Sequence, residues 1–324
     1  MSATRDAPEG SATTATGSVA SRGLLSDALS IARYHIVLVA MVASLVFGFV
    51  LVGKRSLFVA ALVGVDWFLI NLVNRVTDIA EDLKNGIPGT ERVARRRTAL
   101  AVGSVALFVS SIALSHAIAP ALTPWRVAVQ LIGVAYNYRV LPVPGRGGVS
   151  FSRFKELYFF KNFASSVLFV LTCFAYPIVE AGAWSSVPRS ALVTLVVFFV
   201  AFELTYEILY DLRDLEGDRA EGVPTYPVVH GPLVARRIID GLLALAAAAL
   251  AIGFLFRAVG VRELLMLVAP AAQLAFYRPR FARGLTTPDC VWLTHLGTIE
   301  LLVFLAGTEV WRRAGLPDNV WLGG

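Results

Sequence analysis

The chain has 324 residues, of which 56% are hydrophobic and 16% are charged, and its mean hydropathy is +0.68. This composition is too apolar and too poor in charge for an ordinary soluble domain, so it indicates a polytopic membrane protein. The net charge of +6 does not indicate a nucleic-acid partner, because the basic residues collect between apolar runs, where they orient a protein in the bilayer. Cys173 and Cys290 lack paired or metal-ligand spacing, so neither a disulfide nor a zinc site is expected.

Two regions follow from the hydropathy pattern. Residues 1–24 are rich in Ser, Ala, Thr and Gly and have no apolar period, so we predict a disordered cytosolic tail. Residues 25–324 are predicted to form one transmembrane domain with about nine apolar runs of spanning length or nearly so. The runs are Tyr34–Val52, Leu57–Thr77, Thr98–Ile118, Trp125–Tyr138, Leu157–Val179, Ser190–Tyr210, Ile238–Phe256, Glu263–Tyr277 and Thr294–Trp311, the fourth and eighth being short.

The second run ends in an acidic stretch. Asn74, Asp78 and Asp82 recur every fourth residue, so on a helix with 3.6 residues per turn they form one column of oxygen atoms. Two further steps of four residues back from Asn74 lead to Asp66, about 12 Å deeper along the helix. An ionisable group at that depth usually faces a cavity. The alternative for Asp66 is a structural hydrogen bond between helices.

A second acidic stretch ends the sixth run. Asp211, Asp214 and Asp218 have the spacing i, i+3, i+7, which again selects one face of a helix. Steps of four residues back from Asp211 lead to Glu207 and then Glu203, so this column also extends into the membrane.

Both columns end even-numbered runs, so they are expected on the same side of the membrane as the N-terminus. Basic residues are concentrated on that side: Lys84, Arg92, Arg95, Arg96, Arg97, Arg139, Arg146, Arg153, Lys155, Arg236 and Arg237. The positive-inside rule therefore predicts that the N-terminus and the acidic face are cytoplasmic.

Oxygen-bearing groups gathered at one membrane face repel one another unless a cation lies among them. Such hard ligands suit Mg²⁺, which completes its coordination with water and substrate phosphate oxygens. The two columns are therefore predicted to hold a metal-bridged diphosphate. The alternative is two solvated helix ends whose acids balance the neighbouring Arg75, Lys84, Arg213 and Arg219.

These motifs resemble those of a known family. Asn74-xxx-Asp78-xxx-Asp82 followed by Asp211-xx-Asp214-xxx-Asp218 resembles the paired aspartate-rich motifs of the UbiA superfamily of intramembrane prenyltransferases. The similarity extends, in family order, from about Leu25 onward through the segments Tyr136–Arg139, Lys161–Asn162 and Glu216–Gly231.

The resemblance implies an all-helical membrane protein in which nine helices surround a central cavity, with cytoplasmic cap loops after helices two and six. It implies Mg²⁺-dependent transfer of a prenyl group from an isoprenyl diphosphate to a lipophilic acceptor, such as a quinone precursor, a tetrapyrrole, a carotenoid or a lipid alcohol. The implied metal ligands are Asn74, Asp78, Asp82, Asp211, Asp214 and Asp218, and the five aspartates are the implied catalytic residues. Lys161, Tyr138 and Arg139 match positions that contact the diphosphate or close the site.

Further residues are assigned by their chemistry. Glu203, Glu207 and Asp66 are candidates to bind or deprotonate the acceptor. Phe198, Phe202 and Tyr206, with Trp67, Phe159 and Phe160, are candidates to shield a carbocation with their ring faces, the alternative being packing surface. Arg75 departs from the Asn-Asp that opens the first motif in many family members, and the segment Asn85–Arg92 also differs.

Two other functions remain open from the sequence. Within the same superfamily, a phosphoribosyl group is moved onto a polyprenyl phosphate, which requires a wetter cavity with fewer aromatic residues. A cation-coupled secondary transporter could use Asp66, Glu203 and the two columns as an ion path. Broken helices at the acidic sites would favour the transporter, but the only glycine or proline in the stretches Val73–Asp82 and Leu204–Asp218 is Gly217.

Overall fold

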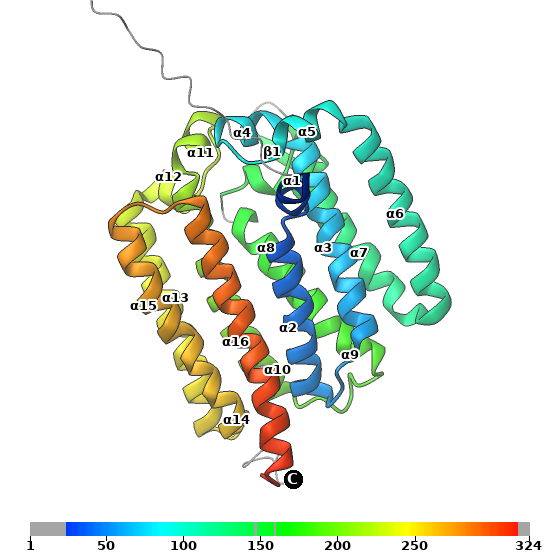
Figure 1. The fold of residues 1–324 in the computed structure, drawn as a ribbon, viewed down its shortest axis with the longest axis vertical. Helices are drawn as coiled ribbons and strands as arrows, with labels where there is room; N and C mark the ends of the chain where they lie inside the picture. Colours follow the sequence, from blue (N-terminus) through cyan, green and yellow to red (C-terminus); the bar gives the residue numbers. More distant parts are fainter. Residues whose placement is uncertain (1–23, 146–147, 159, 317–324) are drawn as a thin grey trace, which may run out of the picture.

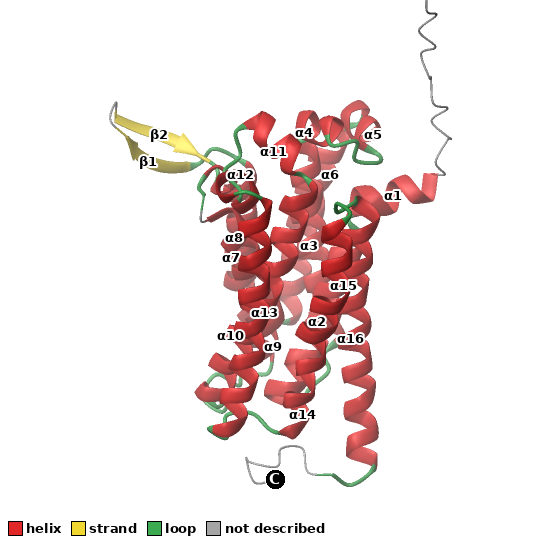
Figure 2. Cartoon of the chain, turned by 90° about the vertical axis from the view of Figure 1, so that its left-hand side faces the viewer, coloured by secondary structure: helices red, strands yellow, loops and turns green. Residues whose placement is uncertain are grey.

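The computed structural model describes residues 24–145, 148–158 and 160–316. The predicted tail at residues 1–24 lies outside this part of the chain, except for Leu24, which begins the first helix. Most of the described residues are helical, and the long helices run side by side along the long axis of the molecule (Figures 1 and 2).

The elements follow one another in a simple order. The first half contains α1 (Leu24–Ala32), α2 (Tyr34–Val52), α3 (Leu57–Thr77), α4 (Ile79–Lys84), α5 (Thr90–Arg95), α6 (Arg97–Ile118), α7 (Thr123–Asn137), β1 (Leu141–Gly145) and β2 (Gly148–Ser152). The second half contains α8 (Phe160–Val170), α9 (Tyr176–Glu180), α10 (Arg189–Arg213), α11 (Leu215–Glu221), α12 (Tyr226–His230), α13 (Pro232–Leu255), α14 (Val261–Leu264), α15 (Val268–Ala282) and α16 (Thr287–Arg313).

Seven helical segments of the described chain are long and apolar enough to cross a membrane. They are α2, α3, α6, the segment from α8 to α9, α10, α13 and α16. The other two predicted runs correspond to α7 and α15, which have 15 residues each. Since about 20 residues span the hydrocarbon core, these seven segments confirm the multi-pass membrane architecture expected from the composition.

The segment from α8 to α9 contains a π-helical turn over Leu171–Ala175. Pro177 follows this turn at the start of α9. Proline has no N–H to donate to the carbonyl four residues earlier, and its ring crowds that carbonyl. A wider local turn accommodates this crowding without ending the helix.

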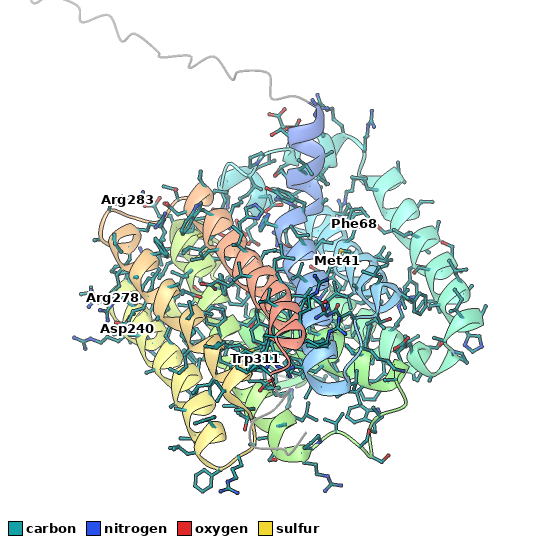
Figure 3. All side chains as sticks on the ribbon, turned by 60° about the horizontal axis from the view of Figure 1, so that its bottom comes forward. Met41, Phe68, Asp240, Arg278, Arg283 and Trp311 are labelled. Atoms are coloured by element: carbon teal, nitrogen blue, oxygen red, sulfur yellow. The ribbon has the colours of Figure 1, made fainter. Side chains whose placement is uncertain are left out.

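The core lies where α2, α3 and α10 meet the π-helical turn. Phe47 of α2 stacks on Phe174 with 4.3 Å between ring centroids, and both side chains are buried. On the outer surface, Arg278 of α15 pairs with Asp240 of α13 at 3.1 Å (Figure 3).

Both acidic stretches lie at the same end of the bundle, where the chain leaves α3 for α4 and α10 for α11 (Figure 1). The short helices α4 and α11 contact each other there. A Cβ atom on Gly217 would lie 2.1 Å from Asn85 Oδ1, so a larger residue here would force the Asn85 side chain to move. Lys84 and Glu221 form an ion pair between the same two helices.

The prediction of continuous acidic columns is wrong at the middle residue of each. Asp78 has φ −102° and ψ 25° and separates α3 from α4, and Asp214 has φ −91° and ψ 9° and separates α10 from α11. Each stretch therefore bends at its centre. Neither aspartate caps the following helix with its side chain; the Asp78 carboxylate accepts from Asn74, and the Asp214 carboxylate pairs with Arg213.

The prediction of an all-helical fold is also incomplete. β1 and β2 form an antiparallel hairpin that pairs Leu141 with Ser152 and Gly145 with Gly148. The hairpin projects away from the bundle at the end that carries the acidic stretches (Figure 2). Pro142 and Pro144 prevent a helix in this segment, and alternation of valine with polar or small residues favours a strand.

Asp66 of α3 is part of a polar network inside the bundle. Arg126 of α7 binds it through two nitrogen atoms, with Nη2–Oδ1 at 2.6 Å and Nε–Oδ2 at 2.9 Å. The Tyr176 hydroxyl donates to Oδ2 at 3.0 Å, and Gln130 Nε2 donates to Oδ1 at 3.1 Å. Both ionic side chains are fully buried, at 0% exposure. This network joins α3 and α7 to the segment from α8 to α9.

We expect Arg126→Met to destabilise the protein strongly, because it leaves the Asp66 carboxylate buried without its cation. Breaking one side of a buried ion pair costs about 3–5 kcal/mol. The melting temperature of detergent-solubilised protein measures this effect. The double variant Asp66→Leu/Arg126→Met, which removes both charges, should recover most of the loss. An unchanged melting temperature for Arg126→Met would contradict a structural role for the pair.

Candidate functional site

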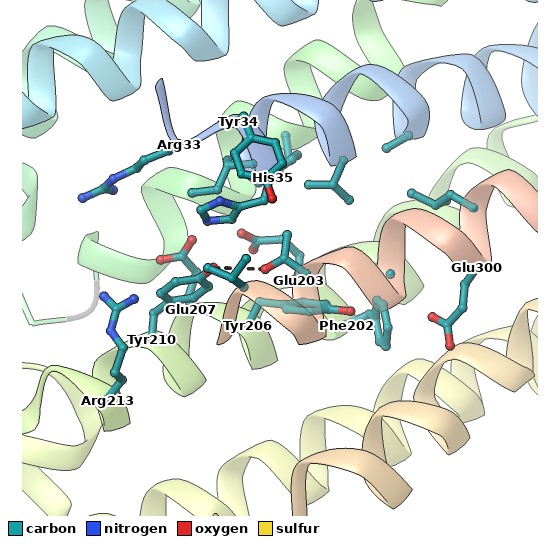
Figure 4. Close-up of a pocket in the computed structure, with 18 of the residues that line it drawn as sticks. Arg33, Tyr34, His35, Phe202, Glu203, Tyr206, Glu207, Tyr210, Arg213 and Glu300 are labelled. Atoms are coloured by element: carbon teal, nitrogen blue, oxygen red, sulfur yellow. Dashed lines mark hydrogen bonds between the residues drawn. The ribbon is translucent and has the colours of Figure 1, made fainter. Parts of the chain in front are cut away.

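A cavity of about 1160 Å³ occupies the bundle and reaches the end that carries the acidic stretches. Its polar end is lined by Asp78 and Asp218, and its deeper part by apolar residues such as Phe198 and Phe304. Elements α2, α3, α10 and α16 all contribute to its wall (Figure 4). The cavity therefore joins a charged mouth to an apolar interior.

The first acidic stretch is held by hydrogen bonds and ion pairs. Asn74 donates to the Asp78 carboxylate, and Lys155 Nζ lies 2.6 Å from Asp78 Oδ1. Arg75 Nη1 donates to Asp82 Oδ2 at 2.8 Å. All five side chains are buried, at 9% exposure or less. Burial with a basic partner lowers the cost of gathering the carboxylates here.

The second acidic stretch has an equivalent cation. Lys161 Nζ on α8 donates to Asp211 Oδ1 at 2.8 Å and to Asp218 Oδ2 at 3.3 Å. Asn162 Nδ2 donates to the second oxygen of Asp211 at 2.9 Å. Asp214 pairs with its neighbour Arg213. Burial raises the pKa of Asp218 to about 6, against the opposing charge of Lys161.

These pairs and their burial bear on the interpretation of the acids as solvated helix ends. Asp78, Asp82, Asp211 and Asp218 are between 1% and 8% exposed, so they are not solvated helix ends. Part of the expected charge balance does exist, since Arg75 pairs with Asp82 and Arg213 with Asp214. Lys84 instead pairs with Glu221.

The donor set suits Mg²⁺ in chemistry. The two stretches present carboxylate and amide oxygens to one cavity, and Mg²⁺ binds through one or two carboxylates together with water and phosphate oxygens. Among the described residues, no group of three or more His, Cys, Asp or Glu side chains converges as a complete metal site.

Three of the predicted substrate-binding residues lie away from the cavity. The prediction that Asp66 faces the cavity is wrong, since Asp66 does not line it. Both carboxylate oxygens of Asp66 accept hydrogen bonds from Arg126 of α7. Tyr138 and Arg139 do not line it either, because α7 ends at Asn137 and the chain turns outward. Tyr138 is 46% exposed, and Arg139 pairs with Glu156 at 2.9 Å on the surface.

Tyr136 and Lys155 line the cavity, although the sequence did not single them out. Tyr136 lies in the family-like segment Tyr136–Arg139, where the sequence reading favoured the wrong tyrosine. Lys155 lies in the basic loop after the hairpin, where only its charge was noted. The family-like segment and the basic loop were both visible in the sequence, but whether each side chain points into the cavity depends on the fold.

The mouth also contains an aromatic and histidine cluster from α2, α10 and α16. His35 stacks on Tyr210 with 6.3 Å between centroids and an interplanar angle of 9°. Tyr34 hydroxyl and His295 Nε2 are 2.8 Å apart, and the two histidine rings are 6.4 Å apart. Because the histidines are far apart in the sequence, no joint role was predicted for them. The contact between His35 and His295 depends on the packing of α2 against α16.

The aromatic stripe on α10 faces the cavity. Phe198, Phe202 and Tyr206 all line it, with centroid distances of 6.0 Å and 5.4 Å between successive rings. Trp67 does not line the cavity; it packs on Phe169 at 4.1 Å. Phe159 lies outside the described residues, and Phe160 is 50% exposed.

Glu203 and Glu207 line the cavity beneath the second acidic stretch. Ser165 Oγ lies 3.1 Å from Glu203 Oε1 and 2.8 Å from Glu207 Oε1. Ser166 donates to the other oxygen of Glu203. Figure 4 shows both carboxyl groups on the α10 wall, near His35.

Comparison with solved structures gives the same fold. A UbiA homolog from Archaeoglobus fulgidus bound to DMAPP and Mg²⁺ superposes with a TM-score of 0.62 at 16% identity, covering 86% of this chain and 98% of that one. The apo UbiA homolog from Aeropyrum pernix K1 gives a TM-score of 0.57 at 15% identity, with 86% and 98% coverage.

Comparison of sequences adds a curated relative. A digeranylgeranylglyceryl phosphate synthase from Haloquadratum walsbyi is 33% identical over 94 residues, which are 29% of this chain. The match spans about a third (32%) of the length of that relative.

The family model described as the UbiA prenyltransferase family matches residues 37–292, which is most of the chain. This match confirms the resemblance seen in the paired motifs. The chain belongs to the UbiA prenyltransferase family, which makes it an enzyme of the prenyltransferase class.

Proposed function

We propose that this protein transfers a prenyl group from an isoprenyl diphosphate to a lipophilic acceptor, in a reaction that depends on Mg²⁺. One observation carries the proposal: two buried acidic stretches, each with its own lysine, face the mouth of a cavity whose interior is apolar and aromatic. A prenyl diphosphate has the same division between a charged head and an apolar chain. DMAPP and GPP bound with Mg²⁺ to a UbiA homolog of the same fold support this choice.

The head group would be held at the mouth. Asn74, Asp78, Asp82, Asp211, Asp214 and Asp218 would hold Mg²⁺, which when bound neutralises charge on the diphosphate. Lys155 and Lys161 would exchange their carboxylate partners for phosphate oxygens. They would then stabilise the negative charge that develops as the allylic carbon–oxygen bond breaks and its electron pair leaves with the diphosphate.

The interior would protect the carbocation that remains. Phe198, Phe202 and Tyr206 present rings along one wall of the cavity, and ring faces attract a cation through their quadrupole. Apolar surroundings exclude water, so the cation reacts with the acceptor and is not hydrolysed. This aromatic interior also argues against a phosphoribosyl donor, which is polar along its whole length.

A lipophilic acceptor would enter from the bilayer. Leu265 and Val268 near the start of α15, and Ile299 and Val303 of α16, line the cavity and are exposed on the outer surface. Since these helices run through the apolar band of the protein, the cavity would open sideways into lipid between α15 and α16.

We also propose the membrane arrangement. Residues 25–324 would form one domain in which α7 and α15 cross the membrane with the seven longer segments, giving nine. The helices after α3 and α10 would cap the cavity, and the acidic end would face the cytoplasm, because basic residues are concentrated there.

The helix breaks at Asp78 and Asp214 do not favour a transporter. Transporter helices that bind ions are broken near the middle of the bilayer. These two breaks lie at the ends of 21- and 25-residue helices. A cation path through Asp66 is closed by its ion pair with Arg126.

We expect Asp78→Asn and Asp214→Asn each to reduce Mg²⁺-dependent turnover of geranylgeranyl diphosphate by about 100-fold or more, since each change removes charge worth several kcal/mol at a metal-bridged diphosphate. Pyrophosphate release from purified protein measures turnover. The matched control is Glu216→Gln, an exposed acid of the same stretch that does not line the cavity, and it should retain activity. Turnover that needs no metal and survives both aspartate changes would rule out the proposal.

Lys161→Met should raise the KM for the donor by about 10- to 100-fold, because a hydrogen bond to a charged group is worth about 1.5–3 kcal/mol. Steady-state kinetics with varied donor concentration measure this change. Lys84→Met removes an exposed lysine whose ion pair joins the two caps outside the cavity, and it serves as the control. A KM that is equal in the wild type and Lys161→Met would exclude contact between Lys161 and the diphosphate.

A further inference from the structure

Two carboxyl groups lie one helical turn apart on the cavity wall, below the proposed diphosphate site. Glu207 is four residues from Asp211, which corresponds to about 6 Å along the helix. Glu203 is one turn deeper and is 6% exposed. Both share one neighbour on α8, the Ser165 hydroxyl, at 2.8 Å from Glu207 and 3.1 Å from Glu203. The pair therefore lies where the reacting end of a prenyl donor and its acceptor would meet.

The Ser165 hydroxyl lies within hydrogen-bonding distance of both carboxyl groups, which bears on the number of protons that the pair holds. A serine hydroxyl has one hydrogen and can donate only one hydrogen bond at a time. Ser165 therefore donates to one carboxyl group at a time, and a proton on the other group allows that group to donate to Ser165 in return. Two adjacent carboxylates in an apolar site do not both ionise. The pair thus holds one proton and one negative charge.

The surroundings place the charge on Glu207. Lys161 of α8 attracts negative charge on Glu207, the upper member of the pair. Glu203 lies deeper, next to the Ser166 hydroxyl and near the thiol of Cys173. The other titratable groups that face the pair are Tyr136 of α7, His35 of α2 and Asp211 of α10. Asp211 repels negative charge on Glu207, but Lys161 bonds Asp211 at 2.8 Å, one helical turn above Glu207 and two turns above Glu203. This cation therefore favours the carboxylate on Glu207 and leaves the proton on Glu203.

We propose that Glu207, ionised below Lys161 and sharing the Ser165 hydroxyl with protonated Glu203, is the base that takes the proton lost by the acceptor. The acceptor is then a neutral nucleophile that must lose a proton, namely an alcohol or an electron-rich aromatic ring, and not a carboxylate. This inference rests on the proposed prenyl transfer, and it narrows the acceptor class that the cavity accepts.

The step balances for an alcohol. The donor carbon–oxygen bond breaks, and its electron pair leaves with the diphosphate. A lone pair of the acceptor oxygen forms the new bond to the prenyl carbon, and the O–H bonding pair stays on that oxygen. Glu207 receives the proton, so both carboxyl groups are protonated after the transfer. Proton loss to water at the mouth then restores the single charge. For an aromatic ring, the C–H bonding pair returns to the ring and the proton follows the same path.

A carboxylate acceptor fits this arrangement poorly. It has already lost its proton, so it gains nothing from a base. Its negative charge would also lie close to Glu207 in a site of low polarity, where like charges repel strongly. A tetrapyrrole that reacts through a carboxylate is therefore disfavoured relative to a lipid alcohol or a phenolic quinone precursor.

The proton count can be tested without any substrate. In infrared difference spectra at neutral pH, wild type minus Glu203→Gln should show the C=O band of a protonated carboxyl group. Wild type minus Glu207→Gln should show the bands of a carboxylate. The reverse assignment, or carboxylate bands from both residues, would overturn the proposal.

The catalytic role is tested by separating donor ionisation from transfer. Pyrophosphate release from geranylgeranyl diphosphate without an acceptor reports ionisation, and mass spectrometry of products with 1-O-hexadecylglycerol or palmitate as probe reports transfer. Glu207→Gln should retain pyrophosphate release within about 3-fold and lower transfer to the alcohol by about 100-fold or more, the range of general base catalysis. Glu300→Gln, which removes another acid of the same cavity, should behave as the wild type.

The outcomes distinguish a wrong base assignment from a wrong assignment of prenyl transfer. Unchanged transfer and an unchanged pH profile in Glu207→Gln, or preferential prenylation of palmitate by the wild type, would overturn the base assignment. A wild type that releases no pyrophosphate with Mg²⁺ would instead refute the proposed prenyl transfer, whatever the infrared spectra show for the pair.

Discussion

The structure depends on the neutralisation of carboxylates gathered at one end of a membrane bundle. Asp78 and Asp211 belong to helices far apart in the sequence, and each is buried. Their cations come from one short segment: Lys155 and Lys161 lie six residues apart, between the hairpin and the first turn of α8. A buried carboxylate without a partner is costly. This segment therefore fixes the spacing of the two acidic stretches and, with it, the width of the cavity mouth.

The same constraint explains why the helices end where they do. A straight continuation of α3 and α10 would carry their acids away from each other along parallel axes. The breaks at Asp78 and Asp214 turn the following short helices toward each other, so that Asn85 covers Gly217. The closed end of the cavity is thus a consequence of where the acids lie, and the lysine segment completes it from the side.

Short sequence patterns predicted the features that depend on residues close together in the chain. Hydropathy found the apolar helices, spacing found the two acidic stretches, and the paired motifs identified the family. Contacts between distant segments could not be predicted from the sequence. Arg126 lies near the start of an apolar run and carries no motif, yet it forms a buried ion pair with Asp66, which therefore does not face the cavity. Steps of four residues along a helix correctly predicted that Glu203 faces the cavity, but the same step was wrong for Asp66. An acid at this spacing can line a cavity or form an ion pair with another helix. Which one occurs depends on the facing helix.

Arg75 shows how one departure from the family pattern changes the charge balance of the site. Its guanidinium donates to Asp82 at 2.8 Å and to the Ser30 carbonyl oxygen of α1 at 3.0 Å, and it is 4% exposed. An aspartate in its place, as in many family members, would make the first stretch more negative by two charges. Arg75 therefore supplies, from within the protein, positive charge that offsets the buried Asp82 carboxylate. It also ties the helix before the first membrane span to the acidic stretch, so the position of α1 and the charge of the cavity mouth are set by the same residue.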